Sequence, residues 1–189
     1  MQINTLHAKY SGVYCLYMNP KYELFLALAH QTLDTAVRLL DKAEAFVAEK
    51  GIHEHELMQA TLVPDMFNFT KQIQLISDNA KGYVARLAGK EIVSMPDTES
   101  SISELKGRIE KTKALVKTFS VSDFADADNA KITFTYLGGR HFKGNEFLEK
   151  MAIPNMFFHV SMAYAILRNQ GVAIGKMDYV GGIPTYDNN

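Results

Sequence analysis

Asn155 and His159 are the residues whose types and spacing best fit a functional site. They are four residues apart in a segment expected to be helical, so they share one face of that helix. The rest of this face is apolar: Leu148, Met151, Met162 and Ile166. A polar side chain buried among such residues without a partner costs roughly 1–3 kcal/mol. We therefore expect the pair either to be satisfied by nearby core groups or to line a cavity that holds water, a metal or a substrate.

Four more polar residues lie in the segment 64–89, whose apolar residues recur at helical spacing. Asp65 and Gln72 lie near the edge of its apolar stripe, from where they can face a cleft. Gln74 and Asp78 lie on the polar face, which is typical of a helix surface exposed to solvent. Asp65 also stands at the expected helix start, where the helix dipole favours a carboxylate. A binding role and a purely structural role both remain open for these residues.

Other potential ligands are poorly arranged for chemistry. Residues 53–56 read His-Glu-His-Glu, but Leu57 stands where the zinc-binding pattern His-Glu-x-x-His needs its second histidine. We interpret these residues as a surface turn. Cys15 is the single cysteine, which excludes an internal disulfide and a cysteine-rich zinc site. The sequence also contains no glycine-rich phosphate-binding loop of the familiar types.

Four long segments with apolar residues at steps of three and four are expected to form the helices that position these residues. They are residues 20–50, 64–89, 102–119 and 145–170. Gly51 should end the first helix in a left-handed conformation. Ser101 and Glu104 fit a capping box at the start of the third. Pro154 should remove one backbone hydrogen bond from the fourth helix and bend it.

Residues 131–143 follow a different period from the helices. They alternate between apolar and polar types before the pair Gly138-Gly139, which predicts a small β-hairpin that packs on the helices. The complete pattern predicts an all-α fold, a four-helix bundle with a small β-hairpin in the crossover before the last helix. We expect a single domain over residues 1–189, with a leader (1–19) and a tail (172–189) of uncertain structure.

The composition limits the possible function classes. The chain has 189 residues, of which 47% are apolar and 22% charged, as expected of a soluble globular domain. Its formal net charge of −1 lacks the basic footprint of a nucleic-acid-binding protein. No apolar run reaches the ~18–20 residues of a membrane span, and residues 1–20 lack the basic start and aliphatic run of a signal peptide. We therefore expect a cytoplasmic protein without nucleic-acid or membrane partners.

The last expected helix carries a second apolar face. Opposite Asn155 and His159 it presents Phe157, Val160, Tyr164 and Leu167. A helix that is apolar all round is buried on more than one side. We therefore predict a homodimer formed partly through this helix. Alternatively, Tyr136, Phe142 or the C-terminal tail covers the second face within one chain.

Two blocks of the sequence resemble a known family. The first comprises Pro64-Asp65-Met66-Phe67, Gln72-Ile73-Gln74, Ala80-Lys81-Gly82 and Ala85-Arg86-Leu87-Ala88-Gly89. The second comprises Pro154-Asn155-Met156-Phe157-Phe158-His159 and Ala163-Tyr164-Ala165-Ile166-Leu167-Arg168. Over residues 16–179 the chain resembles an uncharacterised bacterial family, a domain of unknown function, within the DinB/YfiT-like superfamily of predicted metalloenzymes. The resemblance implies a DinB-like four-helix bundle that is often dimeric.

The resemblance also implies a metal site, because members of this superfamily commonly hold nickel or zinc with three histidines. Two of these positions correspond to Asn155 and His159. The third, from the second helix, corresponds to Gln74 by gapless counting, although Gln72 lies nearer the expected cleft. His159 is thus the only histidine of the set, and amide groups are poor ligands for either metal.

A strong metal site at His159 would need a carboxylate such as Asp65 or Asp78, so we favour a protein that binds metal weakly or not at all. We expect a dimeric DinB-like bundle with a small-molecule pocket near His159. The alternative is a divalent-metal-dependent, thiol-linked transferase or hydrolase, in which His159 is a metal ligand or general base and Asn155 orients substrate or water. A DNA-damage-associated protein is a third alternative, which follows only from the superfamily and disagrees with the charge balance.

Overall fold

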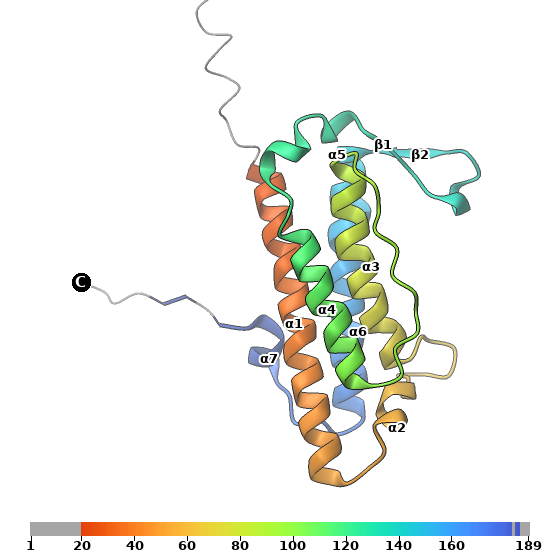
Figure 1. Cartoon of the computed structure of the whole chain (residues 1–189), viewed down its shortest axis with the longest axis vertical. Coiled ribbons are helices and arrows are strands. Elements are labelled where there is room, and N and C mark those ends of the chain that lie inside the picture. The colour runs from red at the N-terminus through yellow and green to blue at the C-terminus, as the bar shows by residue number, and fades with distance from the viewer. Residues whose placement is uncertain (1–19, 183, 186–189) are drawn as a thin grey trace, which may run out of the picture.

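Four long helices lie side by side in a computed structural model that describes residues 20–182, 184 and 185 (Figure 1). α1 (Pro20–Lys50) and α6 (Ile153–Asn169) run in one direction, and α3 (Phe69–Leu87) and α4 (Ile102–Val116) run in the other. This confirms the predicted four-helix bundle. The expected leader, residues 1–19 with Cys15, lies outside the described residues.

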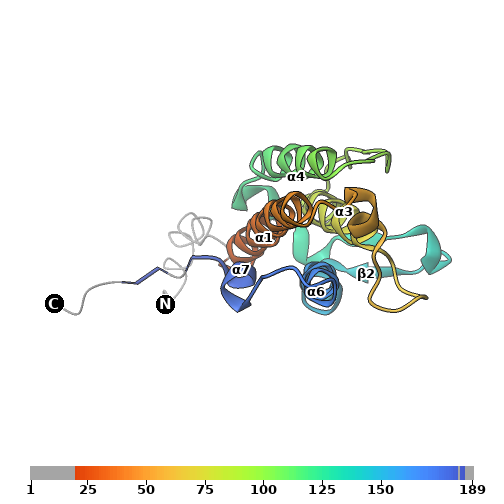
Figure 2. The ribbon, with the colours of Figure 1, turned by 90° about the horizontal axis from the view of Figure 1, so that it is seen from below.

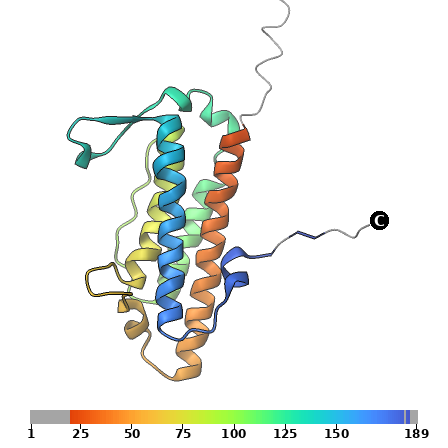
Figure 3. The ribbon, with the colours of Figure 1, turned by 180° about the vertical axis from the view of Figure 1, so that it is seen from behind.

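The bundle is built around a central pair of helices. Seen along the bundle axis, α1 and α3 lie in the middle, with α4 and α6 on opposite sides of them (Figure 2). From behind, α6 runs beside α3 and α1, while the short helix α7 flanks α1 (Figure 3). The apolar core fills the space along this central pair. Among the described helices, none combines the length and the hydropathy that a membrane span requires.

Shorter elements connect the long helices. They are α2 (Glu54–Gln59), three 3₁₀ turns (Val121–Phe124, Ala127–Asn129 and Thr135–Leu137), the strands β1 (Lys131–Thr133) and β2 (His141–Lys143), α5 (Gly144–Phe147), a π-helical turn (Leu148–Ala152) and α7 (Lys176–Val180). The segment 88–101, which we call the strap, leads from the end of α3 back along the bundle to the start of α4 (Figure 1).

Two helix boundaries agree with the sequence prediction. Gly51 follows α1 with a positive φ of 63°. The Ser101 side chain caps α4 by accepting a hydrogen bond from the Glu104 N–H at 3.1 Å. The Glu104 carboxylate reaches back to the Ser100 N–H at 2.6 Å. The side-chain cap by Ser101 is as predicted, whereas the reciprocal bond from Glu104 goes to the residue before the cap and not to Ser101 itself.

The second long helix begins later than predicted. We expected it to start at Pro64, but α3 starts at Phe69, where Asn68 accepts a hydrogen bond from a backbone N–H of the first turn at 2.9 Å. Pro64 instead lies in a turn closed by the Met66 N–H and the Val63 carbonyl at 3.0 Å. Proline fits the second position of such a turn as well as it fits a helix start. The asparagine, which supplies a side-chain cap, therefore sets the boundary.

Residues 53–56 form the start of α2 rather than a simple turn. The Nδ1 of His53 accepts a hydrogen bond from the His55 N–H at 3.2 Å and so caps the helix. The Glu54 carboxylate accepts a hydrogen bond from the Ile102 N–H at 3.0 Å, at the start of α4. These side chains satisfy helix ends, which explains their polar types without a metal.

The predicted hairpin is present but shorter than expected. β1 and β2 pair antiparallel, with Ile132 opposite Phe142, and each strand has three residues. Gly138 and Gly139 turn the chain with φ values of 57° and 84°. Tyr136 leaves the strand pattern in a 3₁₀ turn, and its side chain is 65% exposed. Tyr136 is therefore largely open to solvent.

The last long helix contains a π-helical turn that the sequence analysis did not predict. α5, the turn Leu148–Ala152 and α6 follow one another without interruption from Gly144 to Asn169. We expected Pro154 to disturb a regular helix; instead the wider turn lies directly before this proline, which has no N–H to donate. The extra residue rotates the segment before the turn by roughly 100° against the segment after it.

The buried face of α6 also differs from the predicted one. It consists of Met156, His159, Val160, Ala163, Ile166 and Leu167. Asn155 and Met162, which we placed on the inner face, are half-buried at its edge. The core therefore contacts a face between the two apolar faces that the sequence suggested, and Asn155 lies at the border of the bundle.

The C-terminal segment covers part of the second apolar side of α6. Tyr164 packs edge-to-face on Tyr179 of α7, with ring centroids 5.8 Å apart. α7 is fastened to α1, because Thr35 Oγ1 donates to the Tyr179 carbonyl at 2.9 Å and Arg38 Nε donates to the Asp178 carbonyl at 3.0 Å. The described part of the tail is thus packed, in line with the alternative to a dimer. The homodimer itself stays a prediction.

Candidate functional site

His159 lies in the bundle core and is hydrogen-bonded to Gln72. Its Nδ1 is 2.8 Å from Oε1 of Gln72, and both side chains are buried. The Nε2 of Gln72 donates to the Phe67 carbonyl at 3.4 Å, which orients the amide so that its oxygen faces the imidazole. A neutral imidazole therefore carries its proton on Nδ1 and leaves Nε2 as the basic nitrogen. Of the two candidate glutamines, Gln72 is the one that contacts His159.

The buried imidazole predicts a pH-dependent stability. Burial lowers the pKa of His159, so below pH ~6.5 the unfolded chain binds more protons than the native protein. The free energy of unfolding of the wild type should therefore fall as the pH is lowered from about 7.5 to about 5.5. In urea unfolding at both pH values, His159→Gln should show a smaller decrease than the wild type. His55→Gln, at an exposed position, should behave as the wild type, and an equal decrease in all three proteins would contradict the neutral buried imidazole.

Asn155 is one helical turn from His159 and has a different partner. Its Nδ2 donates to the Tyr83 hydroxyl of α3 at 2.7 Å. Burial raises the pKa of Tyr83, so the hydroxyl keeps its proton at neutral pH. Because the hydroxyl oxygen accepts from Asn155, its own proton is available to a further acceptor.

Asn155 and Tyr83 line a cavity of about 480 Å³ that residues of the hairpin region also line. α3 contributes most of its polar side chains, the strap contributes residues 92–95, and the hairpin region contributes Phe134 and Tyr136. The volume is within the range of small-molecule sites in proteins. Four separate segments of the chain therefore meet around one concave space.

Unsatisfied hydrogen-bond donors are concentrated at this cavity. Three buried side-chain nitrogens in the described part of the chain have no hydrogen-bond partner: Asn79 Nδ2, Arg86 Nε and Arg108 Nε. The first two belong to residues that line the cavity. A buried donor without a partner costs about 1–3 kcal/mol. Both nitrogens are enclosed, so a bound acceptor would reach them after a rotation of the Asn79 amide or the Arg86 guanidinium at the cavity wall.

The charges around the cavity leave a positive surplus. Asp78 Oδ1 is shared by Lys81, at 2.7 Å, and Arg108, at 2.7 Å. Arg86 forms no ion pair with any residue in the described ranges. Its guanidinium lies over the Phe134 ring, 4.5 Å from the centroid. Arg86 is therefore a cation at the cavity wall whose charge no neighbouring carboxylate offsets.

Gly82 gives the cavity room beside the α3 backbone. It is buried within α3 and lines the cavity, and a Cβ built at this position has no heavy atom within 4 Å. A glycine inside a helix costs about 1 kcal/mol relative to alanine. Neither a positive φ nor a close contact requires glycine here. The missing side chain leaves space for a molecule that approaches the helix backbone.

The remaining predicted site residues lie away from His159. Gln74 donates to Glu99 of the strap at 2.9 Å. Asp65 is exposed in the turn that precedes α3. Asp78 lines the cavity but is engaged by Lys81 and by Arg108 of α4. None of these three side chains therefore belongs to the polar pair formed by His159 and Gln72.

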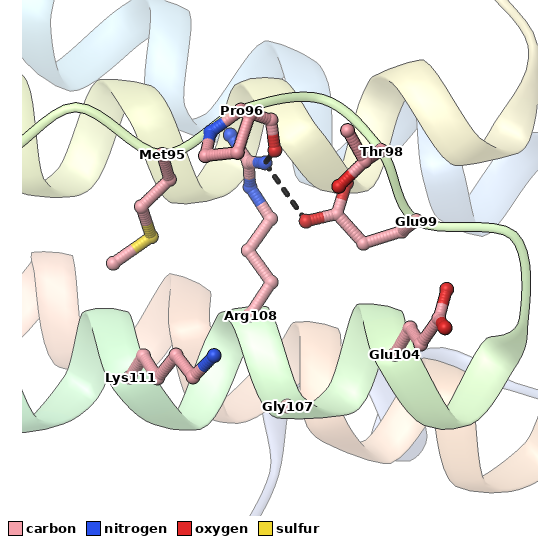
Figure 4. Close-up of a pocket in the computed structure, with 8 residues that line it drawn as sticks. All are labelled: Met95, Pro96, Thr98, Glu99, Glu104, Gly107, Arg108 and Lys111. Carbon is pink, nitrogen blue, oxygen red and sulfur yellow. Dashed lines mark hydrogen bonds and ion pairs between the residues drawn. The ribbon is translucent and has the colours of Figure 1, made fainter.

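Arg108 fastens the strap to the bundle. It is 3% exposed and reaches from α4 towards the strap, beside a smaller cavity of about 310 Å³ (Figure 4). It donates to the Pro96 carbonyl and the Glu99 carboxylate at 2.9 Å each, and it contacts Asp97 at 2.9 Å and Asp78 at 2.7 Å. Three carboxylates therefore surround this one guanidinium, which gives it a structural role.

The donors around His159 do not fit a nickel or zinc site. The Nδ1 of His159 is taken by Gln72, and the Asn155 amide is bonded to Tyr83. Amide oxygens are weak ligands for these metals, and the carboxylates of Asp65 and Asp78 lie elsewhere. Within residues 20–182, 184 and 185, no three His, Cys, Asp or Glu side chains come together in a way that could hold a metal ion.

Only part of this cavity could be identified from the sequence. Asn155 and Asp78 were expected at a site, whereas Tyr83 and Arg86 had no predicted role. One usable signal was Gly82, because a glycine inside an otherwise regular helical pattern indicates a packing or functional reason. The contribution of the strap had no comparable signal, since its residues show no regular period.

Comparisons with known proteins agree with the predicted fold. Residues 22–180 match the family model of DUF1993, a domain of unknown function. A DinB family member protein from Shewanella denitrificans, known from a crystal structure, is 35% identical to this chain with a TM-score of 0.83. The similarity covers 90% of this chain and 98% of that one. No curated protein matches the sequence.

Proposed function

Because the chain belongs to the DUF1993 family and has a DinB-like fold, as the resemblance predicted, we propose that it is a small-molecule-binding protein whose ligand occupies the cavity beside Asn155. The observation that carries this proposal is the position of two unsatisfied buried donors, on Asn79 and Arg86, at one cavity. After a rotation of either side chain, a ligand acceptor at this place would form a hydrogen bond that the protein alone leaves unmade.

This proposal moves the expected pocket by one helical turn along α6. Asn155 lines the cavity, whereas His159 is not among its lining residues and is bonded to Gln72 in the core. His159 then serves to hold α6 against α3. We favour binding over catalysis because the basic imidazole does not line the cavity. The thiol-linked transferase or hydrolase stays the alternative prediction.

We also propose that a second copy of the chain packs near the His159–Gln72 pair. Phe158 of α6 is 49% exposed, and its ring centroid is 5.3 Å from that of His159. Phe67, whose carbonyl accepts from Gln72, is 57% exposed. Two residues adjoining this polar pair therefore have large apolar side chains exposed to solvent, and burial of these side chains would favour association.

A fluorescent probe tests the binding function. Anilinonaphthalene sulfonate should bind the folded, full-length protein saturably and with one-to-one stoichiometry. Gly82→Leu should weaken this binding at least about tenfold, because the new side chain extends into the cavity. Fluorescence titration measures the affinity, and thermal unfolding verifies that the variant is folded.

Gly107→Leu is the matched control for this experiment. Gly107 is also within a helix, has no heavy atom within 4 Å of a built Cβ, and lines the smaller cavity beside Arg108. This variant should bind the probe as the wild type does. Equal probe binding by Gly82→Leu and Gly107→Leu would contradict the proposed site.

A further inference from the structure

We infer that the ligand is an amphipathic oxyanion, with one acidic head at Arg86 and Asn79 and an apolar body between the hairpin and the strap. This inference rests on the proposed function and adds the chemical class of the ligand. It follows from the separation of side chains around the cavity, where α3 contributes polar groups and the hairpin region and the strap contribute apolar ones.

The acidic head follows from the donors that α3 presents. Asn79 Nδ2 and Arg86 Nε are buried without partners, and the Tyr83 hydroxyl has a proton to donate. Asp78 is the single carboxylate among the described lining residues, and two cations already bind it. Hydrogen bonds between ionised groups are roughly twice as strong as neutral ones. The cavity therefore selects an anionic acceptor over a neutral one.

The apolar body follows from the opposite walls. Phe134 and Tyr136 stack with ring centroids 5.2 Å apart, and Val93 of the strap also lines the cavity. Tyr136 is 65% exposed and Val93 is 48% exposed, so apolar surface of both walls is left in contact with water. A ligand with an apolar body would remove this surface from water, which is favourable.

Other ligand classes fit these walls less well. Inorganic phosphate would satisfy the donors but would leave the aromatic rings and Val93 without a partner. An organic cation would meet the positive charges of Arg86 and Lys81 at close range. A neutral apolar molecule would leave Asn79 and Arg86 unsatisfied. A molecule with both an acidic head and an apolar body matches the donors of α3 and also covers the apolar side chains of the hairpin region and the strap.

Two probes that differ in a single group test this inference. Anilinonaphthalene sulfonate and phenylnaphthylamine share the same apolar body, and only the first carries an acidic head. The wild type should bind the sulfonate at least about tenfold more tightly than the neutral amine. Arg86→Met should weaken sulfonate binding about 10- to 100-fold and amine binding less than about threefold. Arg86→Lys, which keeps the charge, should retain most of the preference for the sulfonate.

A matched arginine and a set of competitors complete the experiment. Arg140→Met removes an exposed arginine of the hairpin region that does not line the cavity, and it should bind both probes as the wild type does. Phenylbutyrate and phenyl phosphate should displace the sulfonate probe, whereas phenylbutanol should not. Whichever of these two acids displaces the probe at the lower concentration identifies the head as a carboxylate or a phosphate ester.

The outcomes separate this inference from the proposed function. Equal affinity for the two probes, or equal displacement by phenylbutanol and phenylbutyrate, would overturn the acidic head. If Gly82→Leu still prevents binding of both probes, the cavity remains a small-molecule site. If neither probe depends on Gly82, the proposed function and the ligand class are both overturned.

Discussion

Gly144→Ala should destabilise the protein by about 3 kcal/mol or more, because a Cβ at this position would lie 1.7 Å from the Ala127 carbonyl oxygen. Gly144 is buried at the start of α5, where the chain passes from the hairpin into the last long helix. The obstructing atom belongs to the backbone of a 3₁₀ turn, so it cannot move aside as the end of a flexible side chain can. Urea unfolding followed by circular dichroism measures the loss.

Gly82→Ala provides the opposite result for comparison. Its Cβ has open space within α3, so this variant should gain about 0.5–1 kcal/mol from the better helix propensity of alanine. The same chemical change should thus lower stability at Gly144 and raise it at Gly82. A Gly144→Ala protein as stable as the wild type would show that the backbones of α5 and the 3₁₀ turn are not in close contact.

Arg108→Met should lower the free energy of unfolding by about 3–5 kcal/mol. The substitution removes the cation that Asp78, Asp97 and Glu99 share. The three carboxylates then lie near one another without this positive charge between them. Burial by itself would raise the pKa of Asp97, but the hydrogen bond from Lys71 and the charges of Lys71 and Arg108 lower it. The stability that Asp97 contributes is therefore present above its unfolded pKa and lost as the pH falls below about 4.

Two measurements check this second prediction. Chemical unfolding at neutral pH should show the lower free energy of unfolding of Arg108→Met. As the pH is lowered below about 4, this variant should then lose less stability than the wild type, because Arg108 no longer lowers the pKa of Asp97. Lys106→Met is the control, because Lys106 pairs with Asp41 and Glu44 on the surface, where such pairs contribute at most about 1 kcal/mol. An equal loss of stability in the two variants would mean that the buried ion pairs of Arg108 stabilise the protein no more than the surface pairs of Lys106.

The architecture could be predicted because it depends on local patterns. Helical spacing of apolar residues, Gly51 after α1 and Ser101 before α4 all act within a few residues of the chain. The π-helical turn at Leu148–Ala152 escaped prediction because an analysis of period assumes a constant rotation per residue. One inserted residue changes which face of the helix is buried, and no single residue type signals the insertion.

The site could be predicted only in part because its contacts join separate helices. The pairing of Asn155 with Tyr83 depends on how α3 and α6 are rotated about their axes, which sequence period does not determine. The choice between Gln72 and Gln74 shows the same limit. Residues two positions apart on a helix point in directions that differ by roughly 200°, so Gln72 contacts His159 while Gln74 contacts the strap.

The parallel direction of α3 and α4 places a minimum on the length of the strap. α3 has 19 residues, which correspond to about 28 Å, and an extended chain covers about 3.3 Å per residue. About nine residues are needed to return along α3, so residues 88–101 exceed this minimum by about five residues. Deletions longer than about five residues would prevent α4 from entering the bundle in its present direction. During evolution, the strap is therefore freer to change its sequence than to lose length.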